Sequence, residues 1–326
     1  MARVLSCIQP TGDVHLGNYL GAVRRWVEDQ TPESFHGIVD LHALTVPRDP
    51  AEMRKRTLEL AQILLASGLE PTSTTLFVQG HIHEHPELAW ILECTASIGE
   101  LERMTQFKDK SSKQSGFISA GLLTYPTLMA ADILLYDAEE VPVGDDQRQH
   151  LELTRDVAIR FNSRYGDTFV VPKVTIAKVG ARIMDLQNPT NKMSKSDDSP
   201  QGTVLVLEDP AAIERKIKRA VTDTDNEVRY DPATKPGIAN LLVILSVCTG
   251  ERPEVLAGKY AQYGPLKADT AAALVEYLRP VQKRYAELEA DPGYVRQVLT
   301  DGAAKAQAIA AVTLARAKDA LGLLPR

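Results

Sequence analysis

Residues 4–18 read VLSCIQPTGDVHLGN, and this stretch sets the fold class. Val4–Ile8 is a short apolar run, Gln9–Gly12 holds the turn residues that end it, and apolar residues recur at helical spacing from Leu16 onward. A strand that passes through a tight turn into a helix is the repeating unit of α/β proteins. The stretch therefore predicts a sheet protein of this class whose first strand starts at residue 4.

The rest of the first 189 residues alternates in the same way. We expect further strands at residues 37–41, 75–79 and 140–143, and helices at residues 49–66, 87–98, 127–136 and 146–162. Such alternation predicts an α/β fold, a doubly wound parallel (Rossmann-like) sheet with helices on both faces. Sheets of this kind bind ligands outside the carboxyl ends of their strands.

After residue 190 the sequence is mostly helical. Val204–Leu207 is the last run that suits a strand, and Asp209-Pro210 then starts a helix. Helical periodicity continues at residues 238–248, 253–262, 266–289, 293–299 and 302–321. We therefore expect a first domain over residues 1–189, a helical second domain over residues 190–290, and a last helix, within residues 291–326, that packs back on the first domain.

Composition narrows the functional classes. The chain has 326 residues, a net charge of −6 and three widely separated cysteines, Cys7, Cys94 and Cys248. An odd, dispersed set argues against a disulfide framework and favours a reducing compartment. The N-terminus turns polar at once and no apolar run is long enough for a membrane span, so we expect a cytoplasmic protein. The negative charge argues against a general nucleic-acid coat.

Two short motifs have the chemistry to bind phosphates. His15-Leu16-Gly17-Asn18 lies where a helix begins, so free N–H groups and two side chains one turn apart can face an anion. Lys192–Ser196 reads KMSKS among small hydroxylated residues, which is typical of an exposed loop whose ammonium groups can follow phosphate charge. Either motif alone is weak, since a pair of lysines is more often a solvated loop, and neither is a Walker loop.

Together the two motifs resemble those of the class I aminoacyl-tRNA synthetases, in which a HIGH-type motif and a KMSKS loop lie on either side of ATP. The resemblance implies that an amino-acid carboxylate attacks the α-phosphate of ATP bound to Mg2+, that pyrophosphate leaves, and that the adenylate then acylates tRNA. Such a displacement needs positioning and charge neutralisation more than a covalent group. The catalytic residues implied are His15, Asn18, Lys192 and Lys195.

The identity of the amino acid depends on another part of the chain. Asp132 is the one carboxylate in the apolar helix expected over residues 127–136. It either bonds to a neighbouring helix end or hydroxyl, which composition favours, or accepts a hydrogen bond from a substrate in an apolar pocket. Indole N–H is donor-only and suits such an acceptor, and a phenolic O–H suits it as well. The residues themselves leave tryptophan and tyrosine both open.

A wider resemblance decides between them. The similarity is to bacterial tryptophanyl-tRNA synthetases, and it covers nearly the whole chain, with residues 99–108, 121–126, 129–136, 141–147 and 178–184 beside KMSKS. It implies a tryptophan–tRNA ligase that uses ATP, Mg2+ and tRNA(Trp), a homodimer, and a helical tRNA-binding domain with the lysine loop at its hinge. The alternatives are a tyrosine–tRNA ligase and a catalytically silent synthetase paralogue acting as a tryptophan- or ATP-binding module.

The resemblance also implies the residues of the site. The tryptophan-binding residues implied are Asp132, Tyr125, Met129 and Gln147. The ATP-binding residues implied are Gln9, Pro10, Thr11, Gly17, Asn18, Gly144, Asp145, Asp146, Ile183, Lys192, Met193, Ser194, Lys195 and Ser196. Charge makes four residues candidates for tRNA contact, although such a cluster is more often a solvated helix face: Arg215, Lys216, Lys218 and Arg219. No metal site within the protein is expected.

Several other features point less clearly to function. The three histidines of His81–His85 suit zinc, but Pro86 and a helix start favour a solvent-facing loop. His42 follows a strand and is either structural or near the pocket. One of three lysines is expected to reach ATP without the sequence saying which: Lys108, Lys110 and Lys113. Cys7 stands where the family usually has glycine, and we expect a small buried residue there.

Overall fold

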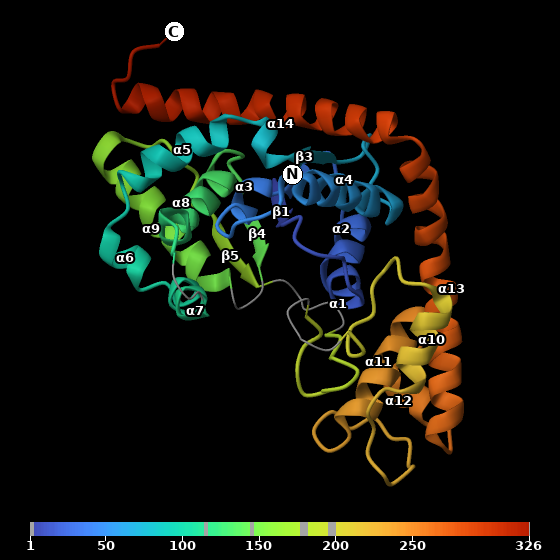
Figure 1. The fold of residues 1–326 in the computed structure, drawn as a ribbon. Coiled ribbons are helices and arrows are strands. Elements are labelled where there is room, and N and C mark those ends of the chain that lie inside the picture. Colours follow the sequence, from blue (N-terminus) through green and yellow to red (C-terminus); the bar gives the residue numbers. More distant parts are fainter. Residues whose placement is uncertain (1–2, 114–116, 144–146, 177–181, 195–199, 326) are drawn as a thin grey trace.

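Five parallel strands form one sheet in the order β3-β2-β1-β4-β5 (Figure 1). This computed structural model describes residues 3–113, 117–143, 147–176, 182–194 and 200–325. The strands are β1 Val4–Ile8, β2 Ser34–Ile38, β3 Thr75–Val78, β4 Glu140–Val143 and β5 Lys173–Ile176. The chain runs outward from β1 to β3 and then returns to β4 and β5 on the other side, so the strand order reverses at β1. The doubly wound sheet is confirmed, and the carboxyl end of β1 is where such a sheet binds its ligand.

Helices cover both faces of the sheet. They are α1 Leu16–Asn18, α2 Arg24–Glu28, α3 Asp40–Ala43, α4 Pro50–Ala66, α5 Glu84–Glu93, α6 Ile98–Glu102, α7 Thr105–Lys113, α8 Ala120–Leu134 and α9 Arg148–Tyr165, with the π-helix η1 Tyr19–Val23 joining α1 to α2 and the 3-10 turn η2 Gln79–His81 after β3. Side chains of a strand alternate between faces. Leu5, Phe35 and Phe77 therefore pack on α5, α8 and α9, whereas Ile38 and Leu76 pack on the α1–α2 run and α4.

The second half of the chain adds helices that share a core with the sheet. They are α10 Pro210–Lys218, α11 Pro236–Thr249, α12 Pro253–Ala257, α13 Tyr263–Ala290 and α14 Pro292–Ala320. Apolar residues of α10, α11 and α13 belong to the same core as α4. Figure 1 shows α13 rising from this helical part and α14 lying across the sheet. None of the helices in the described ranges is long and apolar enough to span a membrane.

α14 is one helix where two were expected, and Gly302 lets it pack closely on the sheet. Gly302 lies at the expected break, yet the helix continues and packs on the edge strand β3. A Cβ atom at Gly302 would lie 1.8 Å from the Leu76 carbonyl oxygen, so only glycine allows this close approach. The break expected between residues 299 and 302 is therefore absent, and Gly302 serves the packing on β3.

Two expected elements differ from the observed ones in their bounds, and one observed strand was not expected. We expected a strand at residues 37–41, but β2 ends at Ile38 and α3 begins at Asp40. The apolar run that suggested the strand continues beyond the point where strand pairing stops. The expected helix 87–98 is two helices, since Ser97 and Glu100 form a capping box that starts α6. β5 was not expected at all, because four residues of mixed polarity give a weak signal.

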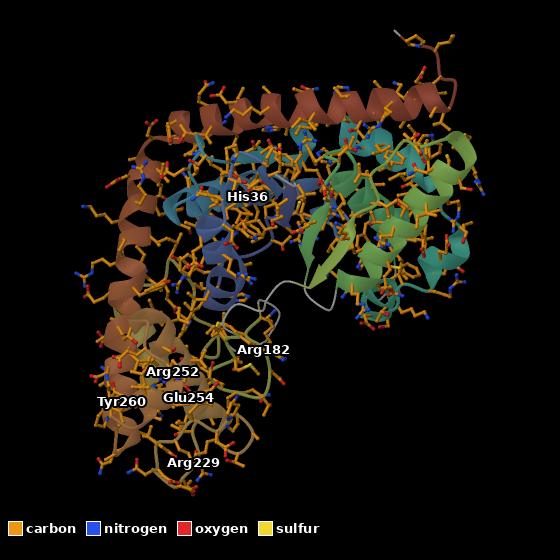
Figure 2. All side chains as sticks on the ribbon, turned by 180° about the vertical axis from the view of Figure 1, so that it is seen from behind. His36, Arg182, Arg229, Arg252, Glu254 and Tyr260 are labelled. Atoms are coloured by element: carbon orange, nitrogen blue, oxygen red, sulfur yellow. The ribbon has the colours of Figure 1, made fainter. Side chains whose placement is uncertain are left out.

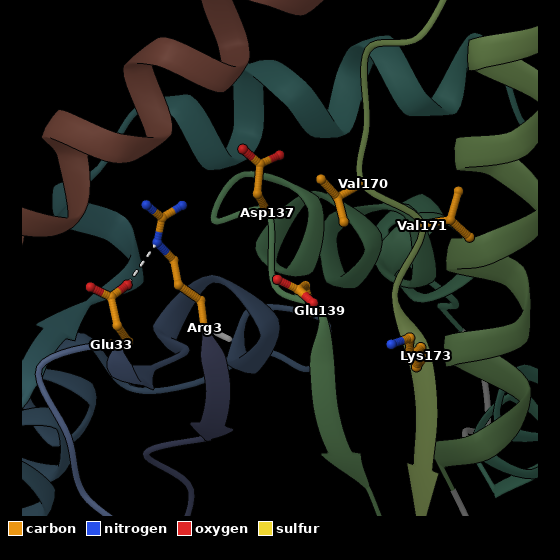
Figure 3. A pocket seen from close by; sticks show the side chains of 7 residues that line it. All are labelled: Arg3, Glu33, Asp137, Glu139, Val170, Val171 and Lys173. Atoms are coloured by element: carbon orange, nitrogen blue, oxygen red, sulfur yellow. Dashed lines mark hydrogen bonds and ion pairs between the residues drawn. The ribbon is translucent and has the colours of Figure 1, made fainter. Parts of the chain in front are cut away.

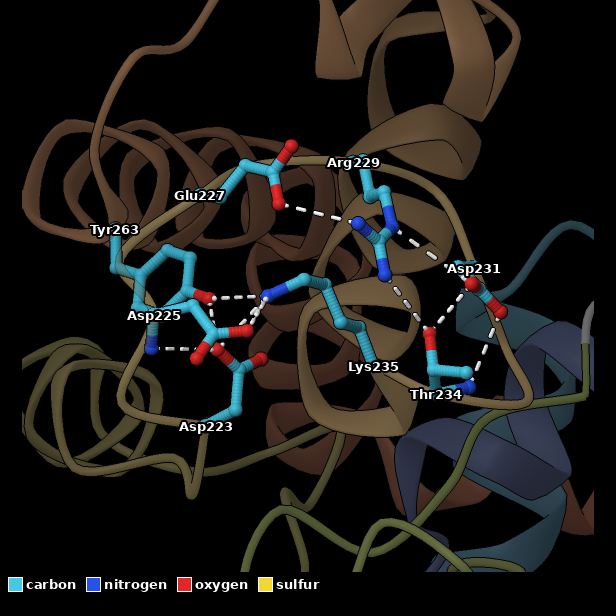
Figure 4. Close-up of polar contacts among 8 residues, drawn as sticks. All are labelled: Asp223, Asp225, Glu227, Arg229, Asp231, Thr234, Lys235 and Tyr263. Carbon is cyan, nitrogen blue, oxygen red and sulfur yellow. Dashed lines mark hydrogen bonds and ion pairs between the residues drawn. The ribbon is translucent and has the colours of Figure 1, made fainter.

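A buried lysine fixes the loop between α10 and α11 (Figure 4). The Lys235 side chain is 2% exposed, and its Nζ lies 2.9 Å from Asp223 Oδ1, 3.0 Å from Asp225 Oδ2 and 3.2 Å from Tyr263 Oη. A buried ammonium without acceptors would be costly, so these three oxygens account for its burial. The cluster thereby holds the backbone that leads into α11.

A cavity of about 370 Å³ lies at the opposite edge of the sheet from the expected ligand site (Figure 3). Its lining residues lie at or just before the amino ends of the strands: Arg3, Glu33, Asp137, Glu139, Val170, Val171 and Lys173. Arg3 donates to Glu33 at 3.1 Å, and Asp137 accepts from Arg316 at 2.6 Å, so several of its charges are already paired. Its place at the amino ends separates it from the carboxyl-end crevice of the sheet.

Candidate active site

The turn after β1 places His15 at the start of a helix. His15 is the N-cap of α1, with φ −94° and ψ 164°, and its Nδ1 accepts the Asn18 amide N–H at 3.2 Å. A ring nitrogen that accepts carries no proton, so Nε2 is the N–H of a neutral His15 ring. Residues 9–11 connect β1 to this cap, with Pro10 buried and its two neighbours partly exposed. The turn thus leads into a helix start as expected, and the Nδ1 atom of His15 takes part in the cap.

Lys192 lies on a short hairpin formed by residues 183–185 and 191–193. The Asp185 amide donates to the Asn191 carbonyl at 2.9 Å, and the Met193 amide donates to the Ile183 carbonyl at 3.0 Å. Met193 and Ile183 are each 1% exposed, whereas Lys192 is exposed. The hairpin therefore anchors itself through its apolar residues and leaves the lysine in solvent.

An amide side chain of the helical part holds this hairpin. Asn240 of α11 accepts the Met184 amide N–H through Oδ1 at 2.9 Å and donates through Nδ2 to the Met184 carbonyl at 2.9 Å. Such a two-point contact fixes both position and orientation. The base of the lysine loop consequently belongs to the same rigid unit as α11.

The His15 turn and the lysine hairpin meet at Gly17. A Cβ there would lie 3.0 Å from His15 Nδ1 and 3.5 Å from Met193 Cβ, so the glycine lets the ring and the hairpin approach. Residues 14–16 also pair antiparallel with residues 204–206 through two backbone hydrogen bonds of 2.8 and 2.9 Å. Two motifs that are about 180 residues apart in sequence are thus joined by direct contacts.

Asp132 of α8 forms the centre of a buried polar cluster. His42 Nε2 lies 2.8 Å from Asp132 Oδ2, while Gln79 Nε2 and His85 Nδ1 lie 2.6 and 2.7 Å from Oδ1. His85 Nε2 in turn lies 2.8 Å from Tyr136 Oη. All five side chains are buried. The donors come from segments that follow β2 and β3, so the carboxyl ends of these strands assemble the cluster.

This cluster keeps the Asp132 carboxylate ionised. Burial by itself would raise its pKa, but hydrogen bonds from His42 and His85 outweigh burial and lower the pKa to about 2. An ionised carboxylate only accepts, and it has about four accepting directions, of which three are used. These three hydrogen bonds therefore leave one accepting direction, on Oδ2, unused. The observed partners are two imidazoles and an amide, not the helix end or hydroxyl of the first sequence hypothesis, and contact with a substrate stays a prediction.

Tyr125 stands beside this cluster on the same helix. Its hydroxyl lies 2.6 Å from His150 Nε2, and its ring meets His42 edge-on with centroids 6.1 Å apart and planes at 82°. Burial raises the pKa of Tyr125, so the phenol remains protonated. Met129, between Tyr125 and Asp132 on α8, is partly exposed. Three of the four residues expected to bind the amino acid thus lie along one side of α8 at helical spacing.

Cys7 is open to solvent, which corrects the expectation that it is buried. It pairs with Gly37, where a Cβ would lie 3.1 Å from the Cys7 sulfur. Burial among protein atoms, and next the charge of Asp132, raise the pKa of the thiol. The Cys7 residue is thus accessible to solvent although protein atoms closely surround its thiol.

The remaining implied residues are placed unevenly. Gln147 is partly exposed at the N-cap of α9, and the Ser194 carbonyl accepts from Thr203 Oγ1 at 3.2 Å. Lys108 is exposed on α7. Other implied residues lie outside the described part of the chain: Gly144, Asp145, Asp146, Lys195, Ser196 and the side chains of Lys110 and Lys113.

The four basic residues proposed to contact tRNA fall into two kinds. Arg215, Lys218 and Arg219 are exposed on or just after α10. Lys216 has a side chain only 12% exposed, and it pairs with Glu208. The cluster seen in the sequence is therefore not one continuous basic surface.

Sequence reasoning missed most partners of Asp132. Gln79, which bonds Asp132, raised no expectation, nor did His150, which bonds Tyr125. The prediction that His81–His85 faces solvent is wrong for His85, which is 1% exposed. Within the described residues, no group of three or more His, Cys, Asp or Glu side chains is arranged to hold a metal ion. The usable signal was position, because polar residues directly after neighbouring parallel strands converge at one edge.

Comparison with known proteins agrees with this geometry. The family model of class I tRNA synthetases (W and Y) matches residues 1–279. Tryptophan–tRNA ligase 1 of Streptomyces coelicolor is 53% identical over 330 residues, covering 100% of this chain and 98% of that protein. The crystal structure of tryptophanyl-tRNA synthetase from Mycoplasma pneumoniae has a TM-score of 0.90 at 37% identity, covering 99% of this chain and 98% of that one.

A liganded structure is also similar. The tryptophanyl-tRNA synthetase of Campylobacter jejuni complexed with ADP and tryptophan has a TM-score of 0.85 at 32% identity and covers 98% of this chain and 100% of that one. Sequence and fold thus agree over nearly the full length of the chain. This chain therefore belongs to the class I tRNA synthetases of the tryptophan and tyrosine family, in the group of the bacterial tryptophan–tRNA ligases.

Proposed function

We propose that this chain is a tryptophan–tRNA ligase that works in two steps at one site. In the first step an oxygen of the tryptophan carboxylate attacks the α-phosphorus of ATP, and pyrophosphate leaves with the electron pair of the broken P–O bond. In the second step a ribose hydroxyl at the 3′ end of tRNA(Trp) attacks the carbonyl carbon of the adenylate, and AMP leaves. Identity over the full length to tryptophan–tRNA ligases supports this reaction.

The observation that carries the choice of tryptophan is the state of Asp132. Its carboxylate is 3% exposed, ionised, and supplied with three internal donors that leave one accepting direction. Indole N–H donates and cannot accept, so it matches that direction. A phenol O–H would also donate to it, but its oxygen can accept a further hydrogen bond as well, whereas the indole N–H is satisfied by this one acceptor. We propose that Tyr125, Met129 and Gln147 complete the amino-acid site around this contact.

On the nucleotide side, we propose that the phosphates of ATP lie between the His15 turn and the lysine hairpin. His15 Nε2 and the Asn18 side chain would donate to the phosphates, and Lys192 and Lys195 would neutralise charge on the departing pyrophosphate. The contact between Gly17 and Met193 supports this, because it brings both motifs to one place. The other nucleotide contacts proposed are Gln9, Pro10, Thr11, Gly144, Asp145, Asp146, Ile183, Ser194 and Ser196.

We further propose the arrangement of partners that the resemblance implies. Residues 1–189 would bind ATP and tryptophan, residues 190–290 would bind tRNA, and the last helix would brace the first of these parts through its packing on β3. Mg2+ would enter as the counter-ion of the ATP phosphates. The active form would be a homodimer in the cytoplasm. Light scattering of the purified protein tests whether it is a dimer.

Arg215, Lys218 and Arg219 are the residues that we propose for electrostatic contact with tRNA. They are exposed at the end of α10, where cations are also favourable to the helix dipole. Phosphate contacts release counter-ions, so tRNA binding should weaken steeply with salt. Adenylate formation does not involve this surface and should tolerate the same salt range.

Amino-acid-dependent ATP–pyrophosphate exchange tests the proposed function directly. Tryptophan, tyrosine and phenylalanine are supplied separately to the purified protein. Exchange with tryptophan alone is the expected outcome, because it requires both the adenylation chemistry and the Asp132 pocket. Exchange with tyrosine would keep the chemistry and overturn the pocket assignment. Tryptophan binding without any exchange would place the protein among silent binding modules.

A further inference from the structure

Lys216 differs from its basic neighbours in what it contacts. Its Nζ lies 2.6 Å from the Thr203 carbonyl oxygen and 2.5 Å from Glu208 Oε1, and both charged side chains are 12% exposed. Glu208 Oε2 in turn accepts the Leu205 amide N–H at 3.0 Å. By contrast, the Lys218–Glu214 pair on the same helix is 57% and 47% exposed. The ammonium of Lys216 is therefore engaged inside the protein.

The segment that Lys216 and Glu208 hold lies between the two motifs. Residues 204–206 pair with residues 14–16 across the His15 turn. Thr203, at one end, donates through Oγ1 to the Ser194 carbonyl of the lysine loop at 3.2 Å. At the other end, Gln282 of α13 donates to the carbonyls of Val206 and Glu208 at 2.9 and 3.0 Å. One segment thus touches both motifs and the long helix.

We propose that Lys216 is a positioning residue for adenylate formation, not a tRNA contact. It acts with Glu208 to hold the Thr203–Glu208 segment in the register that sets the His15 turn against the lysine loop. An ammonium has three donors, of which two are already used here by protein oxygens. A tRNA phosphate would have to displace an enclosed carboxylate to gain the same group, and removal of Lys216 would leave that carboxylate without its counter-ion.

This role predicts a specific kinetic pattern. Small displacements of groups around a transferring phosphate reduce the chemical rate strongly and affect binding of the other substrate little. Loss of the pair should therefore lower kcat of exchange and leave tryptophan affinity unchanged, because neither residue contacts Asp132 or its partners. Since Glu208 is anionic, it has no reason to contact tRNA, and yet it should share the phenotype of Lys216.

The test compares Lys216→Met, Lys216→Arg, Glu208→Gln and the double variant Lys216→Met/Glu208→Gln. Glu214→Gln is the matched control, because it neutralises the carboxylate of the exposed pair on the same helix. Each protein is assayed for pyrophosphate exchange, for tryptophan affinity, for tRNA(Trp) affinity by filter binding at several salt concentrations, and for its melting temperature. Lys218→Met provides the reference for loss of a tRNA contact.

Lys216→Met and Glu208→Gln should each lower kcat of exchange by about tenfold, with unchanged tryptophan and tRNA affinities. The kcat of the double variant should be no lower than that of the less active single variant, because all three variants remove the same ion pair. Lys216→Arg, which keeps charge and donors, should recover most of the rate even if Lys216→Met melts early. Glu214→Gln should match the wild type.

Two results would overturn the proposal. The first is wild-type exchange in Lys216→Met together with weaker, less salt-dependent tRNA binding, as expected for Lys218→Met. The second is wild-type exchange in Glu208→Gln. The inference rests on the proposed function, and the two fail differently: wild-type protein without exchange refutes the function, whereas active wild type with equally active variants refutes only the role of Lys216.

Discussion

The Asp132 pocket and the lysine hairpin are built in opposite ways. At Asp132 every group is buried, and three donors from separate segments converge on one carboxylate at 2.6–2.8 Å. At the hairpin the backbone is fixed by Asn240 and by pairing, while Lys192 itself is exposed. The first region holds its functional atom in one place, and the second holds only the base of its functional side chain.

This difference suits the two tasks. Choosing tryptophan requires an acceptor that neither moves nor changes protonation, and a satisfied buried network provides that. Neutralising pyrophosphate requires a charge that follows the leaving group, and a lysine on a fixed backbone provides that. Under the proposed roles, specificity would depend on side-chain packing, whereas catalysis would depend on where the backbone segments meet.

The largest effect is expected at the pocket. Asp132→Asn replaces an acceptor that serves three donors with an amide that must turn one donor toward them. We expect kcat/KM for tryptophan in pyrophosphate exchange to fall by at least about a thousandfold, because sites built to bond a substrate N–H depend strongly on that bond. Asp137→Asn, just after the same helix and paired with Arg316, is the control. Near-normal kinetics in Asp132→Asn would break the distinction between the two regions.

The hairpin should respond in rate and not in affinity. Lys192→Met removes an exposed ammonium, so tryptophan affinity and melting temperature should stay unchanged. We expect kcat of exchange to fall by roughly a hundredfold to a thousandfold, the usual cost of losing one charge-stabilising donor. Lys259→Met removes a surface lysine that pairs with Glu251 and serves as control. An effect confined to tryptophan affinity would show that Lys192 acts on the ground state.

His36 contrasts with the imidazoles bonded to Asp132, because it is buried without a hydrogen-bond partner among the described residues. His36 on β2, labelled in Figure 2, is 3% exposed. Its ring stacks on Trp26 with centroids 5.2 Å apart, and its ring nitrogens have no hydrogen-bond partner within the described ranges. Burial lowers its pKa from 6.5 to about 4. Between these values the unfolded chain binds a proton that the folded chain does not, so the free energy of unfolding decreases as pH falls through this window.

The contribution of His36 should amount to about 2 kcal/mol between pH 7.5 and pH 5. His36→Phe keeps a ring against Trp26 and removes the titration. Urea unfolding at both pH values should therefore show a smaller pH difference in His36→Phe than in the wild type. His83→Gln, at an exposed histidine, is the control. An identical pH difference in wild type and His36→Phe would show that burial of His36 has no such consequence.

The smallest effect is expected at a residue that acts only through Asp132. His85→Gln removes the ring between Asp132 and Tyr136, and it should lower kcat/KM for tryptophan by about tenfold, as is usual for groups that orient a ligand. His83→Gln, two residues away and exposed, should have no effect. The exchange rate at saturating tryptophan should change little in His85→Gln. A fall in that rate alone would place His85 in the chemistry and not in the pocket.

Much of the fold was predictable because burial follows a local pattern. β1 and β4 were predicted at their observed bounds, and α4 begins after Asp49 and runs from Pro50 to Ala66 as its cap and its proline indicate. Errors arose where the pattern is weak or continues past an element, as at β5 and after Ile38. Such ends are set by where neighbouring strands stop pairing, which no local window contains.

The candidate site was predictable only in part. Both phosphate motifs follow from residue type and spacing, since a helix start and a pair of lysines express their chemistry locally. The roles assigned to them stay predictions. The surroundings of Asp132 could not be read in the same way, because its donors are 47, 53 and 90 residues away in the chain. The basic cluster of α10 misled for the same reason, since charge in sequence does not show that Lys216 is paired with Glu208.

The sequence by itself determined the class of fold and the presence of two phosphate motifs, because periodicity, turn residues and motif chemistry are properties of short stretches. The tertiary structure decided which acceptor Asp132 retains, that Cys7 lies open beside it, and that residues 204–206 tie the His15 turn to the lysine loop. These outcomes depend on which strand ends become neighbours in a doubly wound sheet. That adjacency is a property of the whole chain, since it requires the packing that brings distant segments to one edge.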